Sequence, residues 1–139
     1  DSVHCLRKVL LSLNQKLLDS IASRDFAVYS SLTTEDITGV DSNGNITRDR
    51  SSYWNASVVV IHPPIDDQQE DRKNPSPLLQ ITMAQPMIQL VTSEIAVMIY
   101  NRVECTRGFS VVASKETRVW KKDREGCWEN CHFHRSPVV

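Results

Sequence analysis

Glycine is scarce in this sequence, with only four residues in the whole chain. A loop that cradles phosphate groups needs several glycines close together, and no P-loop, dinucleotide-binding loop, nucleophile elbow or kinase catalytic motif is present. Apolar runs are also short, because a stretch such as residues 57–61 is far below the roughly 20 residues that span a bilayer. The sequence therefore predicts neither a membrane span nor the common nucleotide-dependent chemistries.

An excess of positive charge is also lacking. The chain has 16 Lys plus Arg against 17 Asp plus Glu, for a net charge of -1. Proteins that bind nucleic acid usually carry a strongly basic face, and no basic stripe with interleaved aromatic residues occurs. We therefore expect no nucleic-acid partner.

Cysteine is too sparse for a disulfide framework. The four cysteines, at positions 5, 105, 127 and 131, are not spaced as in small secreted domains. We expect them to be reduced and mostly buried, in a cytoplasmic protein. Glycosylation triplets begin at Asn45 and Asn55, but such triplets arise often by chance.

The first part of the chain is predicted to be helical. With 139 residues, the chain is long enough for a single domain with its own core. Apolar residues recur at steps of three and four from Leu6 to Ile21, which predicts one long amphipathic helix over residues 3–23. Asp25 is placed to cap a short second helix that runs through Tyr29.

The next segment reads as short elements followed by a loop. A short strand is predicted over residues 37–40, followed by a turn over residues 42–45. A short helix is predicted over residues 48–57, with the side chains of Tyr53 and Trp54 facing inward. Residues 62–77 contain four prolines and a cluster of acidic residues. We expect this loop to be mobile because it has little to bury.

After this loop the hydrophobic period changes to two. Four long strands are predicted, over residues 79–91, 94–105, 109–120 and 127–134. Their connections are short, and short connections between neighbouring strands predict an antiparallel meander. The whole pattern predicts an α+β cone in which the long helix covers one face or end of a curved sheet.

Strand alternation brings several charged residues to one side of this sheet. The three sets that share a face are Tyr100, Arg102 and Glu104; Glu116, Arg118 and Trp120; and Cys131, Phe133 and Arg135. Arginine in the middle of a strand that otherwise reads as core is unusual. Three arginines on neighbouring strands predict a cluster on the concave side of the sheet.

Clustered guanidinium groups repel one another and need carboxylate partners or a bound anion. In one interpretation, Glu104 and Glu116 pair with the arginines and the cluster is structural. In the other, the cluster forms a pocket for a small carboxylate or for an acidic side chain of a partner. The residues alone leave both interpretations open.

His132 and His134 put two imidazole groups on the other face of the last strand. Zinc requires three or four ligands, and only these two are visible in the pattern. We therefore predict no metal site and expect the histidines to pack at the sheet surface or at a subunit interface.

The last third of the chain resembles a known family. The run Glu116–Trp120, followed by Trp128 and then residues 132–136, resembles the association (hub) domain of calcium/calmodulin-dependent protein kinase II. Weaker similarity extends over most of the sequence, including Asp25 and Phe26 after the long helix. The resemblance implies the cone-shaped fold of the nuclear transport factor 2 superfamily.

The resemblance also implies a function. Domains of this family have no catalytic activity and no cofactor, and they assemble kinase subunits into a two-tiered ring of identical domains. Their deep pocket carries arginines at the positions of Arg102, Arg118 and Arg135, and it accepts small carboxylates or acidic segments. We expect Tyr100, Glu104 and Glu116 to complete this pocket. The pocket histidine of the family is absent, because residues 51–54 read Ser-Ser-Tyr-Trp here.

Two other functions remain open. The first is a small-molecule enzyme on the same cone, similar to ketosteroid isomerases or dehydratases, which would need a base with a raised pKa in an apolar pocket. An arginine-rich pocket would instead lower the pKa of Glu104 or Glu116 and make either a poor base. The second is an anion-binding module that does not assemble.

Overall fold

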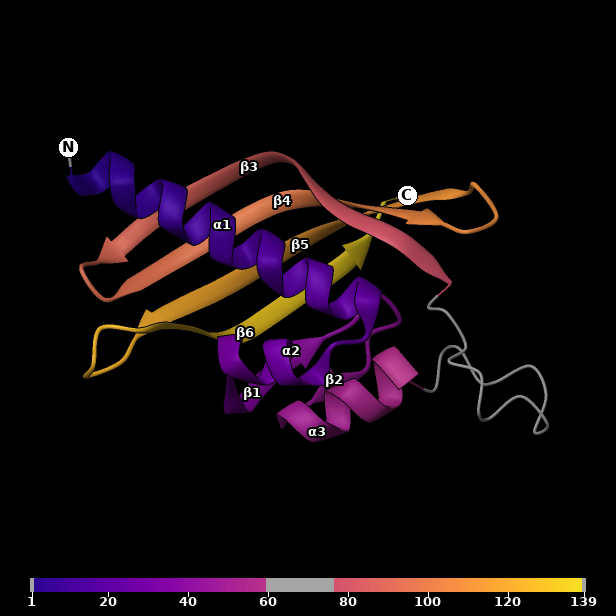
Figure 1. Ribbon diagram of the computed structural model, residues 1–139, viewed down its shortest axis with the longest axis horizontal. Helices are drawn as coiled ribbons and strands as arrows, with labels where there is room; N and C mark the ends of the chain where they lie inside the picture. The colour runs from indigo at the N-terminus through magenta and orange to yellow at the C-terminus, as the bar shows by residue number, and fades with distance from the viewer. Residues whose placement is uncertain (1, 60–76, 139) are drawn as a thin grey trace.

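The computed structural model describes residues 2–59 and 77–138. Helix α1 (Ser2–Ser23) lies across the concave face of a curved sheet, as Figure 1 shows. Its buried face includes Leu10, Leu17 and Ile21. The long helix predicted for residues 3–23 is therefore confirmed, and its apolar stripe is the side that packs on the sheet.

The sheet has six strands in the order β2-β1-β6-β5-β4-β3. The last four along the chain are β3 (Leu78–Thr92), β4 (Ile95–Thr106), β5 (Val111–Lys122) and β6 (Trp128–Pro137). Each pairs antiparallel with the next, so the predicted meander is confirmed. Buried residues alternate along β4 and β5, as expected for strands with one face on the core.

Two further strands complete the sheet beyond β6. Strand β1 (Thr33–Val40) runs parallel to β6, and β2 (Ile46–Thr47) pairs antiparallel with β1. The sequence predicted a strand only over residues 37–40, with no partner for it. Parallel pairing with a strand more than 90 residues further along the chain has no local signature, which is why periodicity did not find it.

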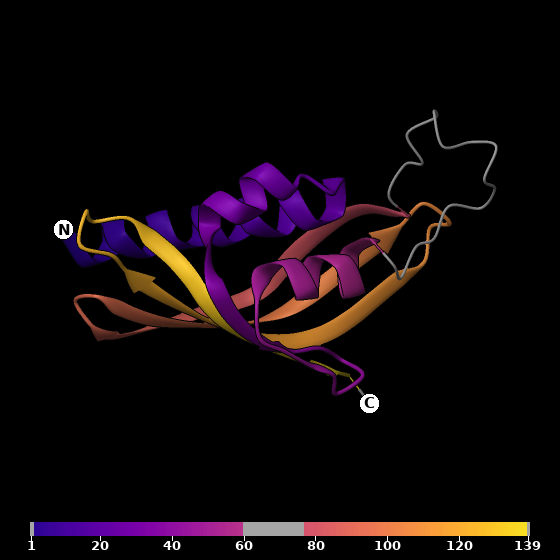
Figure 2. The same cartoon turned by 90° about the horizontal axis from the view of Figure 1, so that it is seen from below.

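Two short helices lie at the end of the sheet where β1 pairs with β6. Asp25 caps α2 (Phe26–Leu32) by accepting a hydrogen bond from the backbone N–H of Val28 at 3.1 Å, as predicted. Helix α3 (Arg50–Tyr53) continues as π-helical turns (Trp54–Val59), close to the predicted range. Figure 2 shows that α1, α2 and α3 lie on the same side of the sheet.

Aromatic rings join the helices at this end. The ring centroids of Tyr29 and Trp54 are 5.0 Å apart, and those of Tyr53 and Phe133 are 4.8 Å apart. Tyr53 and Trp54 are both buried, which confirms that they pack inward. The predicted mobile loop, residues 62–77, lies outside the described residues except at its last position.

The expectation that most cysteines are buried is wrong. Cys5 and Cys127 are exposed, and Cys105 and Cys131 are half-buried. Cys5 lies on the solvent side of α1, and Cys127 lies in the turn between β5 and β6, where neither can reach the core. Within the described part of the chain, no helix is long and apolar enough to cross a membrane.

Candidate functional site

The site is built on the inner face of β4 and β5. Tyr100 and Arg102 point inward from β4, and Glu116 and Arg118 point inward from β5, as alternation predicts. All four are almost fully buried, and Arg118 is 0% exposed. Ionised side chains are rarely buried to this extent unless they are paired.

The Glu116 carboxylate is the centre of the cluster. Its Oε1 accepts hydrogen bonds from Arg118 Nε, at 2.8 Å, and from the Tyr100 hydroxyl. Its Oε2 accepts a hydrogen bond from Arg102 Nη1 at 3.0 Å and lies 3.5 Å from Arg135 Nη1. One buried carboxylate therefore faces three guanidinium groups.

These contacts determine the protonation state of Glu116. Burial alone would raise the pKa of its carboxyl group, but the charges of Arg118, Arg102 and Arg135 outweigh that effect. The pKa of Glu116 therefore lies well below its usual range. Burial raises the pKa of the Tyr100 hydroxyl, and the neighbouring Glu116 charge raises it further. Tyr100 is thus a neutral hydrogen-bond donor to an ionised carboxylate.

A bulge in β6 adds a residue that alternation did not predict. The pairing of β5 with β6 shifts register so that Trp120 faces Asn130 while Val119 faces His132. Alternation had placed Cys131 on the inner face, but the shift brings Asn130 there instead. Arg118 Nη1 donates a hydrogen bond to Asn130 Oδ1 at 2.7 Å. A strand bulge has no clear sequence signal here.

The Arg118 guanidinium also packs against an aromatic ring. Its Cζ lies 4.9 Å from the centroid of the Phe133 ring. A guanidinium over an aromatic face is a favourable contact when both groups are desolvated. Arg118 is therefore held on several sides by protein groups.

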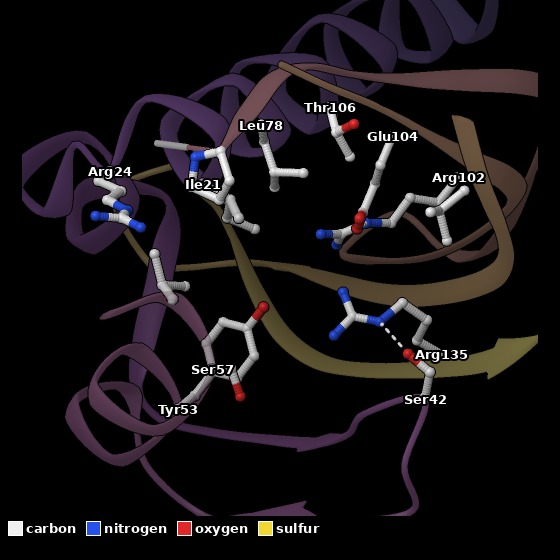
Figure 3. A pocket seen from close by; sticks show the side chains of 13 residues that line it. Ile21, Arg24, Ser42, Tyr53, Ser57, Leu78, Arg102, Glu104, Thr106 and Arg135 are labelled. Carbon is white, nitrogen blue, oxygen red and sulfur yellow. Dashed lines mark hydrogen bonds and ion pairs between the residues drawn. The ribbon is translucent and has the colours of Figure 1, made fainter. Parts of the chain in front are cut away.

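A cavity of about 290 Å³ opens beside this cluster. Arg102, Glu104 and Arg135 line it, whereas Tyr100, Glu116 and Arg118 lie behind its wall. In Figure 3 the guanidinium groups of Arg102 and Arg135 point toward the centre of the cavity. The structure thus brings all six predicted residues together but divides them into a lining set and a buried set.

The two lining arginines also contact protein groups. Arg102 Nε donates a hydrogen bond to Glu104 Oε1 at 2.9 Å, and Arg135 Nε donates one to Ser42 Oγ at 3.2 Å. The predicted pairing with Glu104 and Glu116 is therefore present. Three arginines face only two glutamates, which leaves one positive charge unbalanced among these five residues.

Another arginine belongs to the same cavity. Arg24, which follows α1 directly, also lines it, together with apolar side chains such as Ile21 and Leu78. The sequence pattern did not identify Arg24 as a site residue, because strand alternation says nothing about a turn between helices.

The two histidines lie on the opposite, outer face of the sheet. His132 and His134, with Lys115 and Thr117, line a shallow hollow there. His132 Nδ1 and Thr38 Oγ1 are 2.7 Å apart. Within residues 2–59 and 77–138, no group of three or more His, Cys, Asp or Glu side chains is placed to hold a metal ion.

Comparison with known proteins identifies relatives over the whole chain. The family model described as the calcium/calmodulin dependent protein kinase II association domain matches residues 69–139. The calcium/calmodulin-dependent protein kinase type II subunit delta of Oryctolagus cuniculus is 24% identical over 145 residues, which cover 98% of this chain and 24% of that protein. The chain therefore spans about a quarter of the length of the curated relatives it matches.

Solved structures of the same kind superpose closely. The association domain of the C. elegans kinase has a TM-score of 0.75 at 22% identity and covers 98% of both chains. The hub homology domain of Chlamydamonas reinhardtii has a TM-score of 0.74 at 28% identity, over 95% of this chain and 97% of that one.

Other structures share the fold at lower identity. An NTF2-like protein from Rhodospirillum rubrum has a TM-score of 0.68 at 13% identity and covers 92% of this chain and 97% of its own. A candidate ketosteroid isomerase from Parabacteroides distasonis has a TM-score of 0.65 at 20% identity, over 93% and 85% of the two chains. The fold is therefore the nuclear transport factor 2-like cone that the family resemblance implied, and it agrees with the α+β cone predicted from periodicity.

Proposed function

The chain belongs to the family of calcium/calmodulin-dependent protein kinase II association domains, and we propose that it is a non-catalytic module that assembles into a two-tiered ring of identical copies. In this proposal the arginine-lined cavity binds a small carboxylate or an acidic segment, and the protein acts in the cytoplasm. The family match is the observation that supports assembly. The arginine cluster is the observation that supports ligand binding.

The outer face of the sheet supports self-association. Met87 on β3 and Ile99 on β4 are register partners, and they are 69% and 49% exposed. Ile95, which lies on the same face of β4, is 39% exposed. Exposed apolar side chains that gather on one face of a sheet are typical of a protein–protein interface. In a family of association domains, a second copy of the chain is the partner that fits this patch.

The cavity supports an anionic ligand. A bidentate contact between a guanidinium group and a carboxylate is among the stronger hydrogen-bonded interactions, especially in a partly dry site. Arg102 and Arg135 present guanidinium nitrogens to the cavity, while the Glu116 carboxylate behind them is shared with Arg118. An incoming carboxylate would balance the positive charge that Glu104 and Glu116 leave on the cluster of Arg102, Arg118 and Arg135.

The enzyme alternative rests on the shared fold alone. A general base works best when its pKa is near the operating pH. The pKa of Glu116 is held far below that range, and its carboxylate oxygens are occupied by arginine and tyrosine donors. The charge arrangement therefore favours binding over proton abstraction.

Light scattering in solution tests the assembly. We expect a mass that is a large multiple of the 15.8 kDa of one chain at micromolar concentration. A mass of one chain under these conditions would show that the domain does not assemble by itself.

Thermal melts test the ligand part of the proposal. We expect acetate to raise the melting temperature above that in sodium chloride of equal ionic strength, since a ligand that binds only the folded state stabilises it. Arg135→Gln should weaken acetate binding by roughly 1.5 to 3 kcal/mol, the range for hydrogen bonds to charged groups. The matched control is Arg124→Gln, which changes an exposed arginine in the turn between β5 and β6. Equal melts in both salts would contradict carboxylate binding.

A further inference from the structure

Arg24 has an unusual backbone conformation for an arginine. Its φ is 58°, in the left-handed region, directly after the last residue of α1. The N–H of Arg24 donates to the carbonyl of Ile21 at 3.2 Å, and the N–H of Asp25 donates to the carbonyl of Ser20 at 2.8 Å. This pair of bonds ends a helix in the Schellman motif, which strongly favours glycine at the left-handed position. The arginine therefore carries a conformational cost that glycine would avoid.

Arg24 lines the cavity and forms no ion pair with a carboxylate of the described residues. Arg24 lines the same cavity as Arg102 and Arg135, and Figure 3 shows it at the opposite side of the lining from them. Its Nε is buried and has no hydrogen-bond partner within residues 2–59 and 77–138. No ion pair joins Arg24 to any described acidic residue. A cation near a helix C-terminus is favourable in general, but that effect does not satisfy a buried N–H.

Counting charges changes the class of ligand that fits. The lining has three guanidinium groups, from Arg24, Arg102 and Arg135, and one carboxylate, from Glu104. Behind the lining, Arg118 and Glu116 form an ion pair of no net charge. Among the described residues, the cavity therefore has two positive charges in excess, of which a monocarboxylate would balance only one.

Size and wall chemistry restrict the ligand further. A cavity of about 290 Å³ is at the small end of the roughly 300–1,000 Å³ found for ligand sites. Ile21 and Leu78 form an apolar part of the wall between Arg24 and Arg102, as Figure 3 shows, and Val58 also lines the cavity. A short aliphatic chain with an anionic group at each end matches this arrangement.

We propose that the cavity binds a small aliphatic dicarboxylate, with one carboxylate held by Arg102 and Arg135 and the other by Arg24. This inference rests on the proposed carboxylate binding and adds the ligand class and a second anion contact. The binding energy of the second carboxylate also explains why an arginine occupies a position that favours glycine.

Calorimetric titrations with ligands of matched length test the inference. Succinate is compared with butyrate, and glutarate with valerate, at pH 7.5 and constant ionic strength, where every carboxylate is ionised. We expect each dicarboxylate to bind the parent protein about 10-fold more tightly than the monocarboxylate of the same length. A roughly 10-fold ratio corresponds to the lower end of the free energies typical of hydrogen bonds to charged groups. An acidic tetrapeptide that binds more tightly than succinate would overturn the small-molecule assignment.

Two variants of Arg24 separate binding from folding. Arg24→Gly removes the guanidinium and relieves the left-handed backbone, so this variant should melt at the parent temperature or above it. Arg24→Gln keeps a side chain of similar length without the charge. Both should bind butyrate within about 2-fold of the parent and lose the roughly 10-fold preference for succinate. Arg124→Gln, far from the cavity, should keep that preference.

The outcomes distinguish this inference from the proposed function. If the parent binds monocarboxylates but shows no preference for dicarboxylates, the inference is wrong while the carboxylate pocket stands. The same holds if Arg24→Gly keeps the full preference. If the parent binds none of these ligands, both the inference and the proposed carboxylate pocket are wrong.

Discussion

Arg118 and Arg135 both contact Glu116, but they have different roles. Arg118 is fully buried, and its Nε and Nη1 donate to Glu116 and Asn130. Arg135 is 8% exposed, lines the cavity and lies 3.5 Å from the Glu116 carboxylate. These distances and the burial indicate that Arg118 stabilises the fold, whereas Arg135 is placed to contact a ligand in the cavity.

We predict that Arg118→Ala lowers the free energy of unfolding by roughly 3 to 5 kcal/mol, because it removes the nearest charge partner of a buried carboxylate. Urea denaturation of the variant and the parent measures this difference. Arg124→Ala, which changes an exposed arginine, should change the free energy by less than about 0.5 kcal/mol. An increase in stability for Arg118→Ala would mean that repulsion among the arginines outweighs the pairing with Glu116.

The pairing of β1 with β6 depends on close contact between two residues. Gly39 faces Phe133 in the parallel register, and a β-carbon at Gly39 would lie 2.0 Å from Phe133 Cε1. The ring has little freedom to move, because it is buried against Tyr53 on one side and the Arg118 guanidinium on another. Gly39 is therefore required by the packing of this strand pair and not by its backbone dihedrals.

We predict that Gly39→Ala destabilises the protein by roughly 1 to 3 kcal/mol, the range for overpacking a filled core. Thermal unfolding followed by circular dichroism measures the change. Gly108→Ala is the matched control, since the nearest atom to its added β-carbon would be 3.9 Å away, and we expect it to be near neutral. Equal melting temperatures for the parent and Gly39→Ala would contradict the steric argument.

At the scale of the whole molecule, the sheet has two faces with different uses. The inner face, covered by α1, holds the core and the charged cluster. The outer face presents apolar side chains from β3 and β4 to solvent, including Met87, which is 69% exposed, and Ile99, which is 49% exposed. Because the fold does not need these side chains for its own core, their apolar character is best explained by contact with another copy.

We predict that Ile99→Asp reduces the mass of the assembly in solution, because a carboxylate would be buried without a partner at the interface. Light scattering measures the mass, and circular dichroism checks that the fold is kept. Ile46→Asp is the control, since Ile46 is 70% exposed on β2 at the far edge of the sheet. An unchanged mass for Ile99→Asp would place the interface elsewhere.

Much of the architecture could be predicted from the sequence because it depends on local periodicity. Apolar steps of three and four determined α1, and alternation determined the four strands of the meander. Alternation by itself also placed Arg102, Glu116 and Arg118 on one face of the sheet. The residues of the cluster were therefore predictable, and so were the two possible roles of the arginines.

The rest was decided by contacts between residues far apart in the sequence. The parallel pairing of β1 with β6 and the register shift that brings Asn130 inward are set by the partner strand, so neither has a local signal. The same is true of Arg24, which follows a helix and reaches the cavity only because α1 lies across the sheet. Periodicity determines which face a side chain occupies, whereas tertiary packing determines which groups meet there and which of them reach the cavity.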